Sequence, residues 1–477
     1  MSPHDTPVVR ATLVETWFGL LAADRPVVRQ ERVFLRLVHL SVASVLALGR
    51  HTITQLLVAL GVGHLDWTAW YRLFNRSRID LDAMQAILLG QVAAELPAAG
   101  PVVAAVDATQ LPRTSRTLPG CGFTVQARTP KWRRGIHLAQ RFVGLSLLLP
   151  RSAAGESRAV PLRWLLLRTA KTTACGDAPE RSEGAGAGEL IGWLRAGLDA
   201  LGRAAQALLV LGDGAYSTAP VLSRLPARVV LFARCAKNRA LFAPPPCRPP
   251  GRGRQPWYGD RGPTPHATLH DPDGWRDERF MVRGRPVTVT VKVTGPWLIR
   301  GAPFHPLLLV AVKGVDRGKG TTRRQRDPQF FLTSVRMTGE DEWQVEIPLP
   351  ELLAWAWQRW EVEVMHRELK SGFGVGEQQA WSHRGAASVI PWLVWVYALL
   401  IVAGYRTWGY APPPGPDRGC WWTPRRWSLG RLWQEARHEL WDLGEFRPVW
   451  QRSPDAWAAL AAWTATHLPA VLGCRRL

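Results

Sequence analysis

The spacing of apolar positions divides the chain into segments of different periodicity. Residues 10–95 place apolar side chains at helical intervals, most strongly over 31–48, which predicts a helical first segment. From residue 101 the pattern changes to short, continuous apolar runs, which are typical of buried strands. These runs are 101–107, 141–149, 160–168, 207–213 and 227–234, with a helical pattern at 188–206 between the third and the fourth.

The second half of the chain predicts an insertion into this pattern. Residues 243–265 are rich in Pro, Gly and Arg, which excludes regular helix, and helical periodicity returns only at 349–374. Strand-like runs lie between them, at 285–293, 306–314 and 330–335. Three strands, a helix and a further strand is the order of a ribonuclease-H-like core. We therefore predict an α/β fold in which such a core is interrupted by a β-rich insertion.

The charge balance favours a polyanionic partner. Lys and Arg number 60 against 38 Asp and Glu, which gives a net charge of +22, although a coding bias toward Arg explains part of the excess. Residues 51–78 form a helix-turn-helix candidate with Arg72, Arg76 and Arg78 at its end, and an ordinary helical hairpin explains this pattern equally well. The basic segment 316–327 favours phosphate contact over a solvated loop, with Arg323 and Arg324 as candidates.

Residues 386–404 are uncharged and nearly long enough to span a bilayer. This segment contains Pro391 and stands alone, so we expect a buried helix and no membrane partner. The N-terminus lacks the apolar core of a signal peptide, and the six cysteines form no zinc-binding pattern. Both features favour a location in the bacterial cytoplasm, where thiols stay reduced.

The predicted segments are a helical DNA-binding N-terminal domain (1–97), the first part of the catalytic core (98–242), the β-rich insertion (243–345), the second part of the core (346–410) and a helical C-terminal region (411–477).

Two carboxylates follow apolar runs of this core. Asp107 stands at the end of PVVAAVD and Asp213 at the end of ALLVLGD, where Gly212 and Gly214 permit close approach of other groups. An isolated Asp after a strand is usually a turn or cap residue. Two of them at the ends of strands expected to be neighbours indicate a shared site.

A third carboxylate is expected from the helix at 349–374, which offers Glu361, Glu363 and Glu368. At about 100° per residue, Arg359, Glu363 and Lys370 share one face of this helix. The other two glutamates point elsewhere. An exposed helix with ordinary ion pairs would give the same local pattern, but the ordered set of Asp, Asp and Glu favours Glu363 as a ligand.

Three carboxylates are the ligands that Mg²⁺ or Mn²⁺ prefers, and two such ions can activate a nucleophile and stabilise the leaving oxygen at phosphorus. We therefore predict Asp107, Asp213 and Glu363 as catalytic residues that bind two divalent ions. Arg359 and Lys370 are expected to contact flanking phosphates. The sequence contains neither GxSxG nor a P-loop, which argues against a serine nucleophile and Walker-type phosphate binding.

These residues resemble the DDE transposases of bacterial insertion sequences, in the group with a β-rich insertion. Asp213 follows Asp107 by 106 residues and Glu363 follows Asp213 by 150, a gap long enough for the insertion. Arg359, Glu363 and Lys370 match the family's helix pattern over a resemblance that covers roughly residues 30–410. Ala356 stands where that pattern has Tyr, and Ala108 where many members carry a second Asp.

The resemblance implies cut-and-paste transposition, with end cleavage followed by strand transfer, by a homodimer bound to terminal inverted repeats and target DNA. It also implies that a Trp of the insertion stacks on a flipped DNA base. Trp257 and Trp297 are the candidates, and simple packing is the simpler interpretation of either. We predict Trp297 as the DNA contact. Arg234 and Lys237 are further expected DNA contacts. A non-catalytic DNA-binding descendant and a metal-dependent nuclease without strand transfer are the alternatives.

Overall fold

The structure is a computed structural model of the 477-residue chain. It describes residues 11–126, 132–173, 180–246, 255–313, 327–337, 343–378, 380, 382–411 and 426–442. Two compact units are present, and they interleave along the chain. One comprises residues 92–110 and 120–365 and contains the large sheet. The other comprises 1–91, 111–119 and 366–477 and is helical where it is described.

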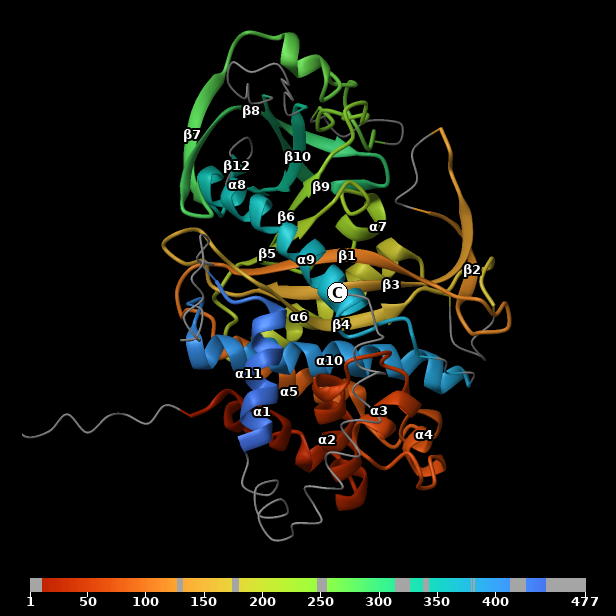
Figure 1. Cartoon of the computed structure of the whole chain (residues 1–477). Helices are drawn as coiled ribbons and strands as arrows, with labels where there is room; N and C mark the ends of the chain where they lie inside the picture. The colour runs from red at the N-terminus through yellow and green to blue at the C-terminus, as the bar shows by residue number, and fades with distance from the viewer. Residues whose placement is uncertain are drawn as a thin grey trace, which may run out of the picture. The chain divides into compact units, whose positions relative to one another are not determined.

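A mixed sheet of ten strands organises the first unit (Figure 1). Its strands are β1 (Val102–Pro112), β2 (Cys121–Val125), β3 (Ile136–Leu148), β4 (Ala159–Leu166), β5 (Leu208–Gly212), β6 (Val229–Arg234), β7 (Trp275–Val282), β8 (Arg285–Ile299), β9 (Ala302–Val312) and β10 (Gln329–Ser334). All five strands predicted for the core form. β1 lies between β3 and β5 in the sheet; it pairs in parallel with β5, and β5 pairs in parallel with β6. This arrangement is compatible with the predicted ribonuclease-H-like core.

The strands predicted in the insertion also form, and they extend the same sheet. β10 pairs antiparallel with β6, and β9, β8 and β7 follow in order. The sequence patterns missed β7 because most of its residues are exposed or partly buried and give no apolar run. The short β2 was missed for the same reason. The sheet therefore continues across the segment that was expected to interrupt the core.

The predicted helix at 349–374 is two helices, which is a correction. α8 (Leu349–Gln358) and α9 (Trp360–Ser371) meet at Arg359. The Arg359 backbone keeps right-handed helical angles, with φ −52° and ψ −27°, and the Val362 N–H donates to its carbonyl in a tighter turn. The helical spacing from Arg359 to Glu363 is therefore preserved across the junction.

Two other helices of this unit matter for the site. α6 (Glu183–Ala200) begins at Ser182, whose hydroxyl accepts the Ala185 N–H, and it packs against β3. The short α7 (Ala219–Leu222) follows β5. The α8 helix packs on β7, where the Trp357 and Phe280 rings meet edge to face.

The helical unit contains α1 (Leu13–Ala22), α2 (Glu31–Leu46), α3 (Ile53–Ala59), α4 (Thr68–Asn75), α5 (Leu81–Ala93), α10 (His383–Trp408) and α11 (Leu429–Asp442). Among the described residues, α10 is the one helix long and apolar enough to cross a membrane, and 89% of its apolar window is buried within the protein. It packs on α1, α2 and α4. In the helix-turn-helix candidate, Arg72 and Arg76 are exposed and Trp70 is buried.

Candidate active site

Asp107 lies within β1, and its predicted place at the strand end is wrong. β1 continues five residues further, to Pro112. Parallel pairing with β5 stops at Ala105, but β1 stays extended beside its other neighbour, β3. Asp107 thus lies just beyond the point where β5 stops pairing, with 18% of its side chain exposed.

Asp213 is the first residue after β5, as predicted. Its Oδ1 accepts the Ala215 N–H at 2.8 Å, which fixes the turn. A Cβ on Gly212 would lie 2.8 Å from the Cβ of Tyr216, so this position requires glycine. At Gly214 an added Cβ would meet nothing closer than 4.0 Å, so the expected close approach applies to Gly212 alone.

Arg359 joins two of the predicted carboxylates. Its Nη2 lies 2.7 Å from Glu363 Oε1, and its Nη1 lies 3.8 Å from Asp107 Oδ2. Only 13% of the Arg359 side chain is exposed. The guanidinium therefore stands between a carboxylate from the sheet and one from the helix.

The two other glutamates considered on this helix have different partners. Glu361 is buried and pairs with Arg283 at 3.2 Å. Glu368 accepts the hydroxyl of Tyr397 at 2.6 Å within the helical unit. The choice of Glu363 is consistent with these contacts, and its role as a ligand stays a prediction.

The pKa of Asp107 reflects the charges around it. It is raised to about 6, chiefly by burial; Arg359 and the Ala108 N–H oppose the rise, and the Asp213 and Glu363 carboxylates contribute to it. Asp213 and Glu363 thus both act on Asp107. Arg359 contacts Asp107 and Glu363, and the charge of Asp213 also acts on Asp107.

The sequence analysis missed three residues beside this site. Tyr216 is fully buried, and its pKa is raised by burial and then by the charges of Glu183, Asp107 and Asp213. Glu183, the first residue of α6, forms an ion pair with Arg141 of β3. Tyr216 follows Asp213 by three residues in GDGAYS, a signal that could have been noticed. Glu183 and Arg141 reach the site through tertiary structure alone.

The predicted DNA contacts fall in different places. Arg234 ends β6 and Lys237 follows it, both exposed, at the sheet edge where β5 also ends, since β5 and β6 are parallel neighbours. Lys370 is half-buried two helical turns beyond Glu363 on α9. Arg323 and Arg324 lie outside the described residues.

The two tryptophans of the predicted insertion differ in exposure. The half-buried Trp297 ring covers Gly262, where a Cβ would come within 2.3 Å of it, and its Nε1 donates to Thr294. Trp257 is 44% exposed and packs edge-on against Phe304, which is itself 75% exposed. Trp297 therefore has a packing role, and stacking on a DNA base stays a prediction for it.

The donor set at the site suits a hard divalent cation, since carboxylate oxygens are its preferred ligands. Within the described part of the chain, no three acidic, His or Cys side chains are close enough together to enclose a metal ion. The Arg359 guanidinium pairs with both Asp107 and Glu363 and supplies positive charge beside them. The residues fit metal binding by their chemistry, and Arg359 pairs with two of the predicted ligands.

Comparison with known proteins gives one family. Residues 29–294 match the family model described as a DDE superfamily endonuclease, which covers more than half of the chain. The match includes Asp107 and Asp213 and ends before Glu363. No curated protein matches the chain.

Proposed function

The chain belongs to the DDE superfamily of endonucleases, and we propose on that basis that it is a DNA transposase of a bacterial insertion sequence. DDE nucleases generally depend on divalent metal ions. The observation that supports the proposal best is that Arg359 pairs with both Asp107 and Glu363, while the charges of Asp213 and Glu363 act on Asp107. The net charge of +22 supports a nucleic-acid substrate.

Asp107, Asp213 and Glu363 would hold two Mg²⁺ or Mn²⁺ ions. Bound there, the metal supplies an activated oxygen nucleophile and stabilises the leaving oxygen at phosphorus. The buried backbone of β1 and β5 fixes the two aspartates, so little reorganisation is needed to bind. Arg359 would exchange its carboxylate contacts for a substrate phosphate, because a guanidinium binds either group with paired hydrogen bonds.

The reaction is hydrolysis at the transposon end followed by strand transfer. In the first step a water oxygen bonds to phosphorus and the bond from phosphorus to the 3′-oxygen breaks. In the second step the freed 3′-hydroxyl oxygen bonds to a phosphorus of target DNA, and the bond from that phosphorus to the target's own 3′-oxygen breaks, which leaves a 3′-hydroxyl on the target strand. The exposed Arg234 and Lys237 at the neighbouring strand end would contact the DNA backbone beside the reacting phosphate.

The test uses three near-isosteric variants, Asp107→Asn, Asp213→Asn and Glu363→Gln. Each is expected to lower Mg²⁺-dependent cleavage of a transposon-end duplex by about a thousandfold or more, while end binding in a gel-shift assay stays largely intact. Asp277→Asn, which changes an exposed carboxylate on β7, is the matched control and should cleave normally. Near-normal cleavage by any of the three variants would remove that residue from the site.

Two alternatives give different results in the same assays. A nuclease without strand transfer would cleave but never join a pre-cut 3′-end to target DNA. A non-catalytic DNA-binding descendant would bind ends with no cleavage in either metal. We propose the terminal inverted repeats and target DNA as partners, a homodimer in the DNA complex, and a cytoplasmic, nucleoid-associated location.

A further inference from the structure

The sheet unit contains a cavity whose lining includes none of the three carboxylates. It has a volume of about 710 Å³, which is within the usual range for small-molecule sites. Its walls come from the segment before β1, the start of β1, the turn after β3, β7 and the first turns of α8. Val103 in its wall belongs to the first residues of β1, four positions before Asp107.

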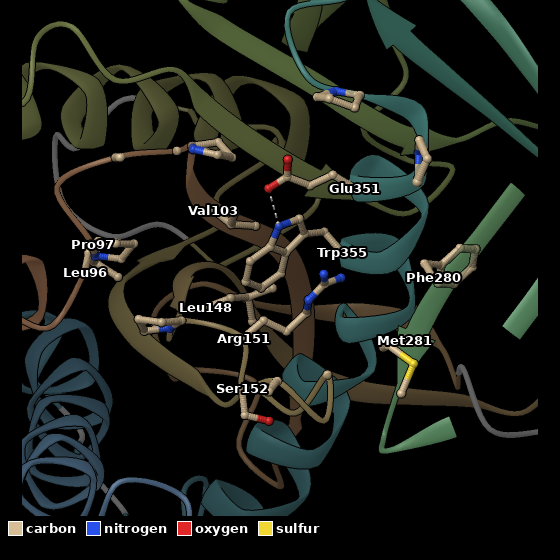
Figure 2. A pocket seen from close by; sticks show the side chains of 18 of the residues that line it. Leu96, Pro97, Val103, Leu148, Arg151, Ser152, Phe280, Met281, Glu351 and Trp355 are labelled. Carbon is tan, nitrogen blue, oxygen red and sulfur yellow. Dashed lines mark hydrogen bonds between the residues drawn. The ribbon is translucent and has the colours of Figure 1, made fainter. Parts of the chain in front are cut away.

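Most of the cavity wall is apolar and buried. Val103, Leu148, Phe280 and Trp355 are each at most 8% exposed and all line it (Figure 2). Five prolines add rigid apolar surface; they are Pro97, Pro101, Pro150, Pro348 and Pro350. Such a wall favours a ligand with a flat or compact apolar body.

The polar part of the cavity is dominated by Arg151. Its guanidinium carbon lies 5.5 Å from the centre of the Trp355 ring, and Figure 2 shows the two side chains together. Its Nη1 is buried without a hydrogen-bond partner among the described residues. Burial lowers the pKa of Arg151, and the nearby Glu351 charge opposes this. A buried guanidinium nitrogen with unused donor capacity is costly unless an acceptor reaches it.

Glu351 does not fill that need. Its Oε1 accepts the Trp355 Nε1–H at 3.4 Å, and it makes no ion pair with Arg151. Arg279, exposed on β7, adds a second cation to the lining. The lining thus carries two guanidinium groups against one carboxylate, a balance that attracts a monoanion.

We propose that this cavity binds a small planar organic anion, with its charged group on Arg151 and its apolar body against the buried wall. We expect binding to affect the active site, because the cavity wall and the site are joined through the α8–α9 junction. The Trp355 carbonyl accepts the backbone N–H of Arg359 at 3.1 Å, and Arg359 joins Asp107 to Glu363. The cavity is therefore a candidate effector site for small molecules.

The experiment compares two probes with the same aromatic body. The probe 8-anilinonaphthalene-1-sulfonate carries an anion, and N-phenyl-1-naphthylamine is its neutral counterpart. Fluorescence titration of the full chain should show one saturable site for the sulfonate. Arg151→Met should weaken sulfonate binding by about tenfold, the effect of one charge-assisted hydrogen bond, and leave the neutral probe unchanged.

Two further variants control for location and folding. Ala99→Trp, at an exposed position of the lining, should fill the cavity and weaken both probes. Arg163→Met removes another guanidinium that stacks on a Trp, 5.2 Å from the Trp193 ring and outside the cavity, and should change neither. Thermal melting identifies any variant that is unfolded.

Three outcomes would overturn the proposal. They are no saturable sulfonate binding by the unmodified chain, an equal loss of both probes in Arg151→Met, and competitive displacement of the sulfonate by transposon-end DNA. Displacement that grows with DNA concentration without levelling off is direct competition and would assign the cavity to DNA, whereas coupling between two sites reaches a limit. None of them bears on the cleavage assay, so the proposed transposase activity stands or fails separately.

Discussion

Asp107 in the sheet unit and Asp24 in the helical unit are both carboxylates whose pKa is raised by burial. Asp24, after α1, is completely buried, its pKa is raised to about 8, and neither carboxylate oxygen has a hydrogen-bond partner among the described residues. The pKa of Asp107 is raised to about 6, and four charged or polar groups act on it. Burial raises both values, but only Asp107 faces Asp213, Glu363 and Arg359.

The difference shows which part of a perturbed pKa carries functional information. Desolvation is common to both residues, so it does not distinguish a catalytic group from a structural one. Neighbouring carboxylates do distinguish the two residues. Holding like charges together costs free energy, and a bound cation can offset that cost. For Asp24, we expect a neutral side chain at physiological pH and an effect on stability alone.

Asp24→Asn tests this comparison with the largest expected effect, a change in the free energy of unfolding. Asp24 has a folded pKa of about 8 against a model value of 3.8, so the folded state binds its proton more tightly. Its contribution is therefore most favourable below about pH 4 and is lost progressively as the pH rises to about 8. Asparagine removes this dependence, and we expect a gain on the order of 4 kcal/mol at pH 8 and little change at pH 4.

Urea unfolding of both chains between pH 4 and pH 9 measures this gain. Cleavage by Asp24→Asn should remain normal at pH 7.5, in contrast to Asp107→Asn. If Asp24→Asn lost cleavage as Asp107→Asn does, the distinction between the two buried carboxylates would be broken.

A smaller effect is expected when the cation beside Asp107 is removed. Arg359→Met takes away the guanidinium that opposes the rise of the Asp107 pKa, so Asp107 should become more like Asp24. Above the folded pKa the ionised carboxylate then lacks its partner, and stability at pH 8 should fall by roughly 1 to 3 kcal/mol. Below about pH 4 the loss should be small, because Asp107 is protonated in both chains.

The control is Arg359→Lys, which keeps the charge and loses the two-nitrogen geometry. It should recover most of the stability at pH 8 but not full cleavage, since a lysine cannot replace paired guanidinium contacts. Equal pH dependence of unfolding in Arg359→Met and the unmodified chain would show that Asp107 does not depend on this cation.

How much of this site the sequence predicts depends on the kind of signal. Apolar runs predicted β5 and the position of Asp213 directly after it, because a buried strand leaves a continuous pattern. They failed at the end of β1, since the extension past Asp107 depends on pairing with β3, a tertiary contact. Helical spacing selected Glu363 beside Arg359, and the two are in contact.

Other parts had no local signal at all. Glu183 reaches the site because α6 packs on β3, and its ion pair with Arg141 joins residues 42 positions apart. Asp24 stands in AADRPVV, which looks like an ordinary helix end, and its complete burial follows from packing within the helical unit. Sequence patterns therefore recover residues fixed by their own strand or helix, and they miss residues fixed by a neighbour.

The smallest expected effect is that of Lys370→Ala. Lys370 lies two turns beyond Glu363 on α9 and is expected to contact a phosphate without acting on either buried carboxylate. Cleavage should fall by roughly three- to tenfold, and the slope of log binding constant against log salt should become less steep by about one. The pH profile of unfolding should match that of the unmodified chain, which separates Lys370 from Arg359. Lys370→Arg, which keeps a phosphate-binding charge, should retain most of the activity; unchanged cleavage and salt slope in Lys370→Ala would remove the phosphate contact from the proposed site.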